Sequence, residues 1–185
     1  MAGVLRQYQS EICGNYRKAY LRYGLFSGLI MSAYVLFMRI IILPVSTPTG
    51  YGTDIALLLC MLLFSYLYRR TLPDERVFFK ELMLMNLGLG VVAAVVYGLF
   101  LLLYGQVFDT DFFTRCMDDF VRNAQNADKP AEDIRRMVEA YQNYRPWHWA
   151  SIGAFRTAVM AIIEAFVAAL VFRTEKNVVK AKPGK

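Results

Sequence analysis

The sequence predicts an all-α membrane protein with four transmembrane helices and an amphipathic two-helix segment between helices 3 and 4. Hydrophobic residues make up 57% of the 185 residues, and they form long blocks rather than alternating with charge. Blocks of about 20 apolar residues match the roughly 30 Å hydrocarbon layer of a bilayer. Several charged residues precede the first block, without the short apolar region of a cleavable signal peptide. We therefore expect that block to be retained as a helix.

Four apolar blocks define the expected spans, at about residues 20–43, 54–68, 82–104 and 147–172. The first block stops at Pro44, where a segment rich in turn residues begins. The second block is the shortest, because the apolar or small residues from Ile55 to Tyr68 form roughly 21 Å of helix. Whether this second span crosses the membrane completely is left open by the sequence.

Lysine and arginine residues predict the orientation of the spans. The N-terminal segment of residues 1–19, the connection between spans two and three and the tail of residues 173–185 are all basic. The connection between spans one and two has no lysine or arginine, and the connection between spans three and four has more acidic than basic residues. The positive-inside rule then predicts a multi-pass inner-membrane protein with both termini in the cytoplasm. This distribution accounts for the net charge of +6, so no nucleic-acid partner is expected.

The connection between spans three and four is predicted to form two outer amphipathic helices within about residues 110–145. Its apolar residues follow helical spacing in two groups, which are Phe112, Phe113, Cys116, Met117, Phe120 and Val121, and then Ile134, Met137, Val138, Tyr141 and Tyr144. Asp128 and Pro130 favour the start of the second helix, and Pro146 favours its end. We expect these helices to cover the bundle or to lie among the lipid headgroups.

The sequence contains no motif that would indicate catalysis or a bound metal. Cys13, Cys60 and Cys116 are far apart, which argues against a metal site and a disulfide framework. The single histidine, His148, lies between Trp147 and Trp149, a composition typical of an interfacial aromatic belt. Because no catalytic or nucleotide-binding motif is present, we expect a non-enzymatic protein without a cofactor.

Small residues recur at every fourth position in three of the predicted spans. The three sets are Gly24, Gly28 and Ser32, then Gly90, Ala94 and Gly98, and then Ala161, Ala165 and Ala169. Small residues allow helix backbones to approach closely in lipid. The pattern favours packing seams within the bundle, and homodimerisation or docking of a partner is the alternative reading.

Polar residues inside the spans are the candidate contacts to a partner or ligand, because such residues are costly in lipid. Arg156 and Glu164 are separated by about 80° and roughly 12 Å along one helix, and no other span carries an obvious opposite charge at matching depth. We expect them to share a polar seam that faces the interior or a partner. Arg39 has Asp54 as its natural partner at similar depth, and Asn86 is expected to hydrogen-bond across helices.

Two stretches resemble a bacterial membrane family. They are RYGLFSGLIMSAY in span one and FFKELMLMNLGLGVVAAVVYGLFLLLYGQVFDTDFF through span three. Together with the outer amphipathic segment and the basic tail, they are similar to domain-of-unknown-function family 4199. The resemblance implies a small inner-membrane protein without established activity. It also implies a gene near a glycosyltransferase that resembles polyprenyl-phosphate sugar synthases, and it transfers no catalytic residues.

Two functions remain in competition at this level. The first is a non-catalytic anchor or accessory subunit of a membrane complex, with a polyprenyl-phosphate glycosyltransferase as the specific partner. Homo-oligomerisation and contact with membrane lipids fit the same reading. The second is a small carrier or flippase for an anionic lipid or lipid-linked substrate, in which Arg39 and Arg156 bind a phosphate from the outer side.

Overall fold

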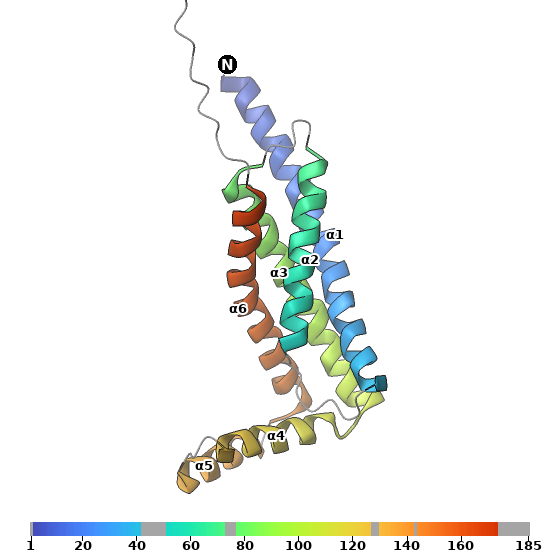
Figure 1. The fold of residues 1–185 in the computed structure, drawn as a ribbon, viewed down its shortest axis with the longest axis vertical. Coiled ribbons are helices and arrows are strands. Elements are labelled where there is room, and N and C mark those ends of the chain that lie inside the picture. Colours follow the sequence, from blue (N-terminus) through green and yellow to red (C-terminus); the bar gives the residue numbers. More distant parts are fainter. Residues whose placement is uncertain (1, 42–50, 73–76, 127–129, 143, 174–185) are drawn as a thin grey trace, which may run out of the picture.

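The chain forms a bundle of long helices capped at one end by a helical hairpin (Figure 1). The computed structural model describes all residues except 1, 42–50, 73–76, 127–129, 143 and 174–185, and no side chains at 2–16, 39–41, 120 and 142. The elements are α1 (Ala2–Ile41), α2 (Tyr51–Arg70), α3 (Phe79–Leu103), the π-helical turn η1 (Tyr104–Phe108), α4 (Phe112–Asn126), α5 (Ala131–Gln142) and α6 (Pro146–Phe172). Within the described part no strand occurs, which confirms the all-α fold class.

Four helices are long and apolar enough to cross a membrane, as predicted. They are Arg17–Met38 within α1, α2, the continuous stretch Phe79–Phe108 and α6. The second of these is longer than the apolar run suggested, since α2 has 20 residues and therefore a length of roughly 30 Å. Its extra residues include Thr53 and Asp54, which are buried against the other helices rather than facing lipid. The polar start of α2 is thus compatible with a complete crossing.

The first helix extends well beyond its membrane-spanning part. The structure continues α1 back to Ala2, so the segment of residues 1–19 is helical almost from its start. The 40 residues of α1 correspond to roughly 60 Å, twice the thickness of the hydrocarbon layer. Its first turns project past the neighbouring helices at the end of the bundle where α6 finishes (Figure 1).

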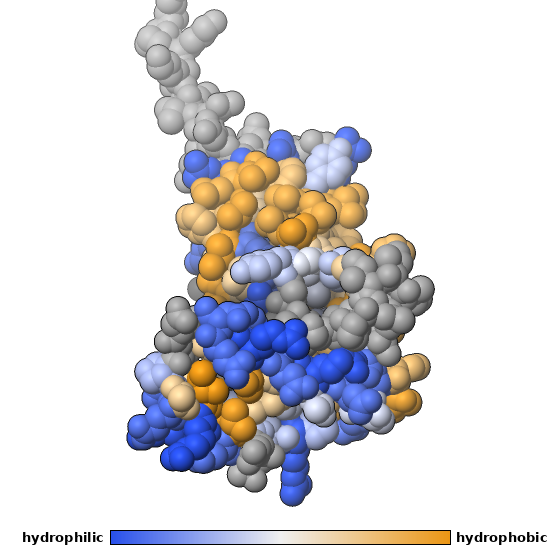
Figure 2. All heavy atoms as spheres, turned by 60° about the horizontal axis from the view of Figure 1, so that its bottom comes forward, coloured by the Kyte–Doolittle hydropathy of each residue, from blue (hydrophilic) through white to orange (hydrophobic). Residues whose placement is uncertain are grey.

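The third helix forms the centre of the bundle. It packs most extensively against α6 on one side and α1 on the other, while α2 packs against α1 and α6. Seven α3 residues are completely buried, which are Leu82, Met85, Asn86, Leu89, Ala93, Tyr97 and Leu101. The outward faces of the helices are apolar and exposed, and they form the orange belt of Figure 2. A belt of this kind is what a hydrocarbon solvent requires of a helix bundle.

The hairpin of α4 and α5 lies across the opposite end of the bundle from the projecting turns of α1 (Figure 1). Hydrophilic side chains gather over this end of the molecule, below the apolar belt (Figure 2). On the inner face of α4, Phe112 and Phe113 are buried, and the ring of Phe112 packs edge-on against Tyr104 at 5.1 Å. The two amphipathic helices predicted between spans three and four are therefore present and cover the end of the bundle.

Pro146 has a different role from the one expected for it. It was predicted to end the second outer helix, but α5 finishes at Gln142 and Pro146 stands in the first turn of α6. Proline suits that position because the first helical N–H needs no partner inside the helix. The backbone N–H of Arg145 donates to Nδ1 of His148 at 3.0 Å. The single histidine thus caps a helix, and its ring stacks on Tyr144 and Trp147.

Candidate functional site

An ion pair joins α2 and α6 near the end of the bundle that carries the hairpin. Nη2 of Arg156 donates to Oδ2 of Asp54 at 2.6 Å. Asp54 is 9% exposed, and the side chain of Arg156 is 32% exposed. A charge-assisted hydrogen bond of this length neutralises both groups where lipid surrounds the bundle. The expectation that no other span carries an opposite charge at the depth of Arg156 is therefore wrong, because the extended α2 brings Asp54 to that depth.

Glu164 lies on the same helix at a separate level. It is eight residues from Arg156, a rise of roughly 12 Å, and Arg156 bonds to Asp54. Glu164 is buried, and within the described part its Oε2 atom has no hydrogen-bond partner. Arg156 and Glu164 thus lie at two levels of α6, and the polar seam expected to join them stays a prediction. The neighbours of Glu164 include Cys60 of α2, which itself lies next to Ser27 of α1.

A third polar contact links α2 and α3. Nδ2 of Asn86 donates to Oγ of Ser65 at 2.8 Å, and both residues are completely buried. This is the interhelical hydrogen bond that the sequence led us to expect of Asn86. The remaining acceptor, Oδ1 of Asn86, has no hydrogen-bond partner among the described residues. This hydrogen bond links α2 and α3, which pack against each other over only a small area, in the interior of the bundle.

The small residues of α1, α3 and α6 form two packing seams inside the chain. A Cβ atom added to Gly24 or Gly28 would lie 2.6 Å from Cβ of a valine of α3. A Cβ atom on Gly90 would lie 2.4 Å from Cβ of Ala161, and one on Gly98 would lie 2.8 Å from Cβ of an alanine of α6. The other members of the three sets, Ser32, Ala94, Ala165 and Ala169, are buried as well. These contacts bring α1 and α6 close to the backbone of α3.

Arg39 is the one polar candidate whose surroundings are not described, because its side chain lies outside the described part. Its pairing with Asp54 therefore stays a prediction, although Asp54 already binds Arg156. Among the described residues, no three histidine, cysteine or acidic side chains gather in a way that could hold a metal ion. The polar candidates with described side chains thus lie at three levels, Asp54 with Arg156, Glu164 near Cys60, and Asn86 with Ser65.

A family model described as "Protein of unknown function (DUF4199)" matches residues 22–174. The chain belongs to the DUF4199 family. No match was found among curated proteins or among solved structures. The matched region contains all three polar levels, both packing seams and the α4–α5 hairpin, so these features lie within the DUF4199 part of the chain. The part of α1 that precedes Arg22 lies outside it.

One polar cluster of this DUF4199 protein escaped the sequence analysis. At the corner between η1 and α4, the Tyr104 hydroxyl donates to Oδ2 of Asp109 at 3.3 Å, and the guanidinium of Arg115 pairs with the same oxygen. Asp109 and Tyr104 are both buried. The cluster fixes the direction in which α4 leaves the bundle. The spacing of five and six residues across a turn matches no helical period, so a search for periodicity could not find it.

Next to this corner, Cys116 is a buried thiol rather than an accessible one. It is 4% exposed, and burial, with a smaller contribution from the charge of Asp119, raises its pKa to about 12. A thiol with so high a pKa stays protonated at neutral pH, and the protonated form is the unreactive one.

Proposed function

We propose that the protein is a non-catalytic, multi-pass inner-membrane subunit that anchors or organises a partner protein. The observation that carries this proposal is the length of α1. The helix begins at Ala2, whereas its uncharged run, which is the part suited to lipid, begins after Arg22 and reaches Met38. Residues 2–16 of the charged part before that run correspond to roughly 22 Å of helix. We call residues 2–16 the arm.

The small residues that pack the bundle support the same proposal, because they are already in contact within the chain. The small residues of α1, α3 and α6 are already buried against one another inside the chain. Two of the three polar levels are also bonded within the chain, by Asp54 with Arg156 and by Asn86 with Ser65. A partner protein would therefore have to bind elements outside these seams. The arm and the α4–α5 hairpin are the two described elements that extend beyond the bundle (Figure 1).

The orientation is part of the proposal. The beginning of α1 and the end of α6 lie at the same end of the bundle (Figure 1), as an even number of consecutive crossings requires. The lysine and arginine distribution favours the cytoplasm for that end. A membrane-impermeant thiol reagent applied to intact spheroplasts should then label Thr114→Cys, an exposed position on α4, in a Cys116→Ser background. Labelling of Arg173→Cys in sealed cells, in place of that reporter, would invert the orientation.

The partner that we propose is a polyprenyl-phosphate glycosyltransferase, which the resemblance to the family implies. The test is affinity purification from native membranes in a mild detergent, followed by mass spectrometry. The parent chain should recover this enzyme, and a chain lacking residues 2–16 should not. A chain lacking residues 174–185 is the matched control, since its deletion lies at the same end. Repeated recovery of the protein alone, or only with copies of itself, contradicts the proposal.

A carrier or flippase for an anionic lipid is the second candidate function. The buried Glu164 carboxyl favours it, since its Oε2 atom has no partner in the described part and such groups often mark substrate paths. The original basis for this reading is weaker, because the charge of Arg156 is neutralised by Asp54. In liposomes, a carrier should move a fluorescent anionic lipid between leaflets and should lose this activity in Glu164→Gln. Absence of transfer by the parent protein would rule against this function.

A further inference from the structure

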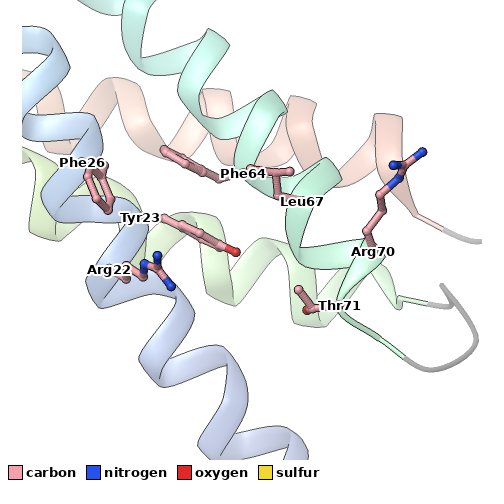
Figure 3. Close-up of a pocket in the computed structure, with 7 residues that line it drawn as sticks. All are labelled: Arg22, Tyr23, Phe26, Phe64, Leu67, Arg70 and Thr71. Atoms are coloured by element: carbon pink, nitrogen blue, oxygen red, sulfur yellow. The ribbon is translucent and has the colours of Figure 1, made fainter.

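A groove of about 400 Å³ lies between α1 and α2, toward the end of the bundle where α2 finishes. Seven residues line it (Figure 3), which are Arg22, Tyr23 and Phe26 of α1, Phe64, Leu67 and Arg70 of α2, and Thr71 in the turn after α2. Its volume falls within the range of sites that hold small molecules. This groove plays no part in the proposed function, and its ligand can be tested separately from any protein partner.

The floor of the groove is apolar and well defined. The rings of Tyr23 and Phe64 stack across the two helices, with their centroids 4.5 Å apart and their planes at 9°. Phe26 and Leu67 flank this pair and are 49% and 40% exposed. In a membrane these exposed side chains face lipid, because both belong to helices that are apolar enough to span it. The floor therefore offers a surface that an acyl chain can cover.

Two guanidinium groups stand at the edges of this apolar floor. Arg22 comes from α1 and Arg70 from the last turn of α2 (Figure 3). Arg22 is the last charged residue before an uncharged run that reaches Met38, which assigns it to the level of the lipid headgroups. Neither arginine forms an ion pair with a described residue. The guanidinium of Arg70 lies 4.8 Å from the centroid of the Tyr66 ring.

We propose that this groove binds one anionic phospholipid. Its phosphate interacts with Arg22 and Arg70, and one acyl chain lies over the stacked rings of Tyr23 and Phe64. Guanidinium groups bind phosphate through charge-assisted hydrogen bonds, which are stronger than a contact with an aromatic face. Two cations that form no ion pair with a described carboxylate favour a lipid with a net negative charge over a zwitterionic one, whose ammonium group they repel.

Native mass spectrometry of the purified full-length protein in detergent tests the site, with phosphatidylglycerol and phosphatidylcholine as probes. The parent protein should retain one phosphatidylglycerol in preference to phosphatidylcholine. The double variant Arg22→Gln/Arg70→Gln should bind phosphatidylglycerol about thirtyfold more weakly, which is the effect of two surface cations. Lys18→Gln removes an exposed charge from α1 outside the groove and should leave binding unchanged.

A groove-filling variant separates a defined site from diffuse attraction. Leu67→Trp keeps both arginines but fills the space that the acyl chain would occupy, so it should also weaken phosphatidylglycerol binding. Circular dichroism and size-exclusion chromatography verify that each variant is folded, and both arginines are exposed, so their substitution removes little packing. Three results overturn the proposal: an equal loss in Lys18→Gln, equal binding of the two lipids by the parent, or full binding by the double variant. Displacement of the lipid by inorganic phosphate would show a headgroup site without a role for the acyl chain, and would also overturn it.

Discussion

Removing Arg156 should destabilise the bundle, because it leaves the carboxylate of Asp54 buried without its partner. Breaking a buried ion pair on one side costs about 3–5 kcal/mol when both groups are fully buried. The side chain of Arg156 is 32% exposed, and Asp54 stands in the first turn of α2, so solvent near the headgroups lowers this cost. We therefore expect Arg156→Gln to lower the free energy of unfolding by about 2–3 kcal/mol.

A double-mutant cycle measures this interaction directly. In Asp54→Asn/Arg156→Gln both groups are neutral, and the double variant should lose less than the sum of the single variants, with a coupling of about 1–3 kcal/mol. Equilibrium unfolding in mixed micelles, followed by the fluorescence of Trp147 and Trp149, supplies the free energies. The cycle of Arg156→Gln with Glu164→Gln is the control, and its effects should add within about 0.5 kcal/mol because these residues occupy separate levels. A larger coupling in the control cycle than in the Asp54 cycle would refute the pairing seen in the structure.

The remaining predictions concern packing, thiol reactivity and the interhelical hydrogen bond. Gly28→Ala should lower the free energy of unfolding by about 1–3 kcal/mol, because its Cβ would lie 2.6 Å from a valine Cβ. Gly153→Ala meets only the end of a leucine side chain, so it should lower the Tm in detergent less than Gly28→Ala does. Equal losses of Tm in the two variants would contradict the packing seam. Cys116 has a pKa raised by burial to about 12, so its rate of maleimide modification should keep rising through pH 10, and a plateau near pH 9 would indicate an ordinary thiol. Asn86→Ala should lower the free energy of unfolding by about 0.6–1.7 kcal/mol, and this loss should vanish in a Ser65→Ala background. An unchanged loss in that background would mean that the hydrogen bond between Asn86 and Ser65 contributes nothing to stability.

The sequence predicted the number and approximate limits of the membrane spans because length and hydropathy are properties of a single helix. It underestimated α2, since hydropathy excludes the polar Thr53 and allows the charged Asp54 only at the very end of the span. In the bundle these residues turn inward, where burial against α6 and the bond to Arg156 compensate for their polarity. The limits of a span thus depend on which way its polar residues face, and that depends on the neighbouring helices.

The polar candidates show the same limit of sequence reasoning. Spacing along one helix correctly separated Arg156 from Glu164 by two turns, but it contained no information on which helix lies opposite each residue. The partner of Arg156 is 102 residues away in the chain. Asn86 was recognised as a residue that must bond across helices, while Ser65 as its partner required the register of α2 against α3. The spacing of small residues was the most informative pattern for packing. Close approach of two backbones depends on small residues lining one face of a helix, and that face can be identified from the sequence of the helix alone.

Site-specific photo-crosslinking in intact membranes tests the central claim, that the arm binds a partner protein, most directly. A photoreactive phenylalanine analogue in place of Tyr8 lies in the arm, and the same residue in place of Glu139 lies on an exposed part of α5 as the matched control. The account predicts a covalent adduct from position 8 that contains a second, different protein in addition to the 21.2 kDa chain, and no such adduct from position 139. Irradiation that yields no adduct from position 8, or only adducts of the chain with itself, would contradict it.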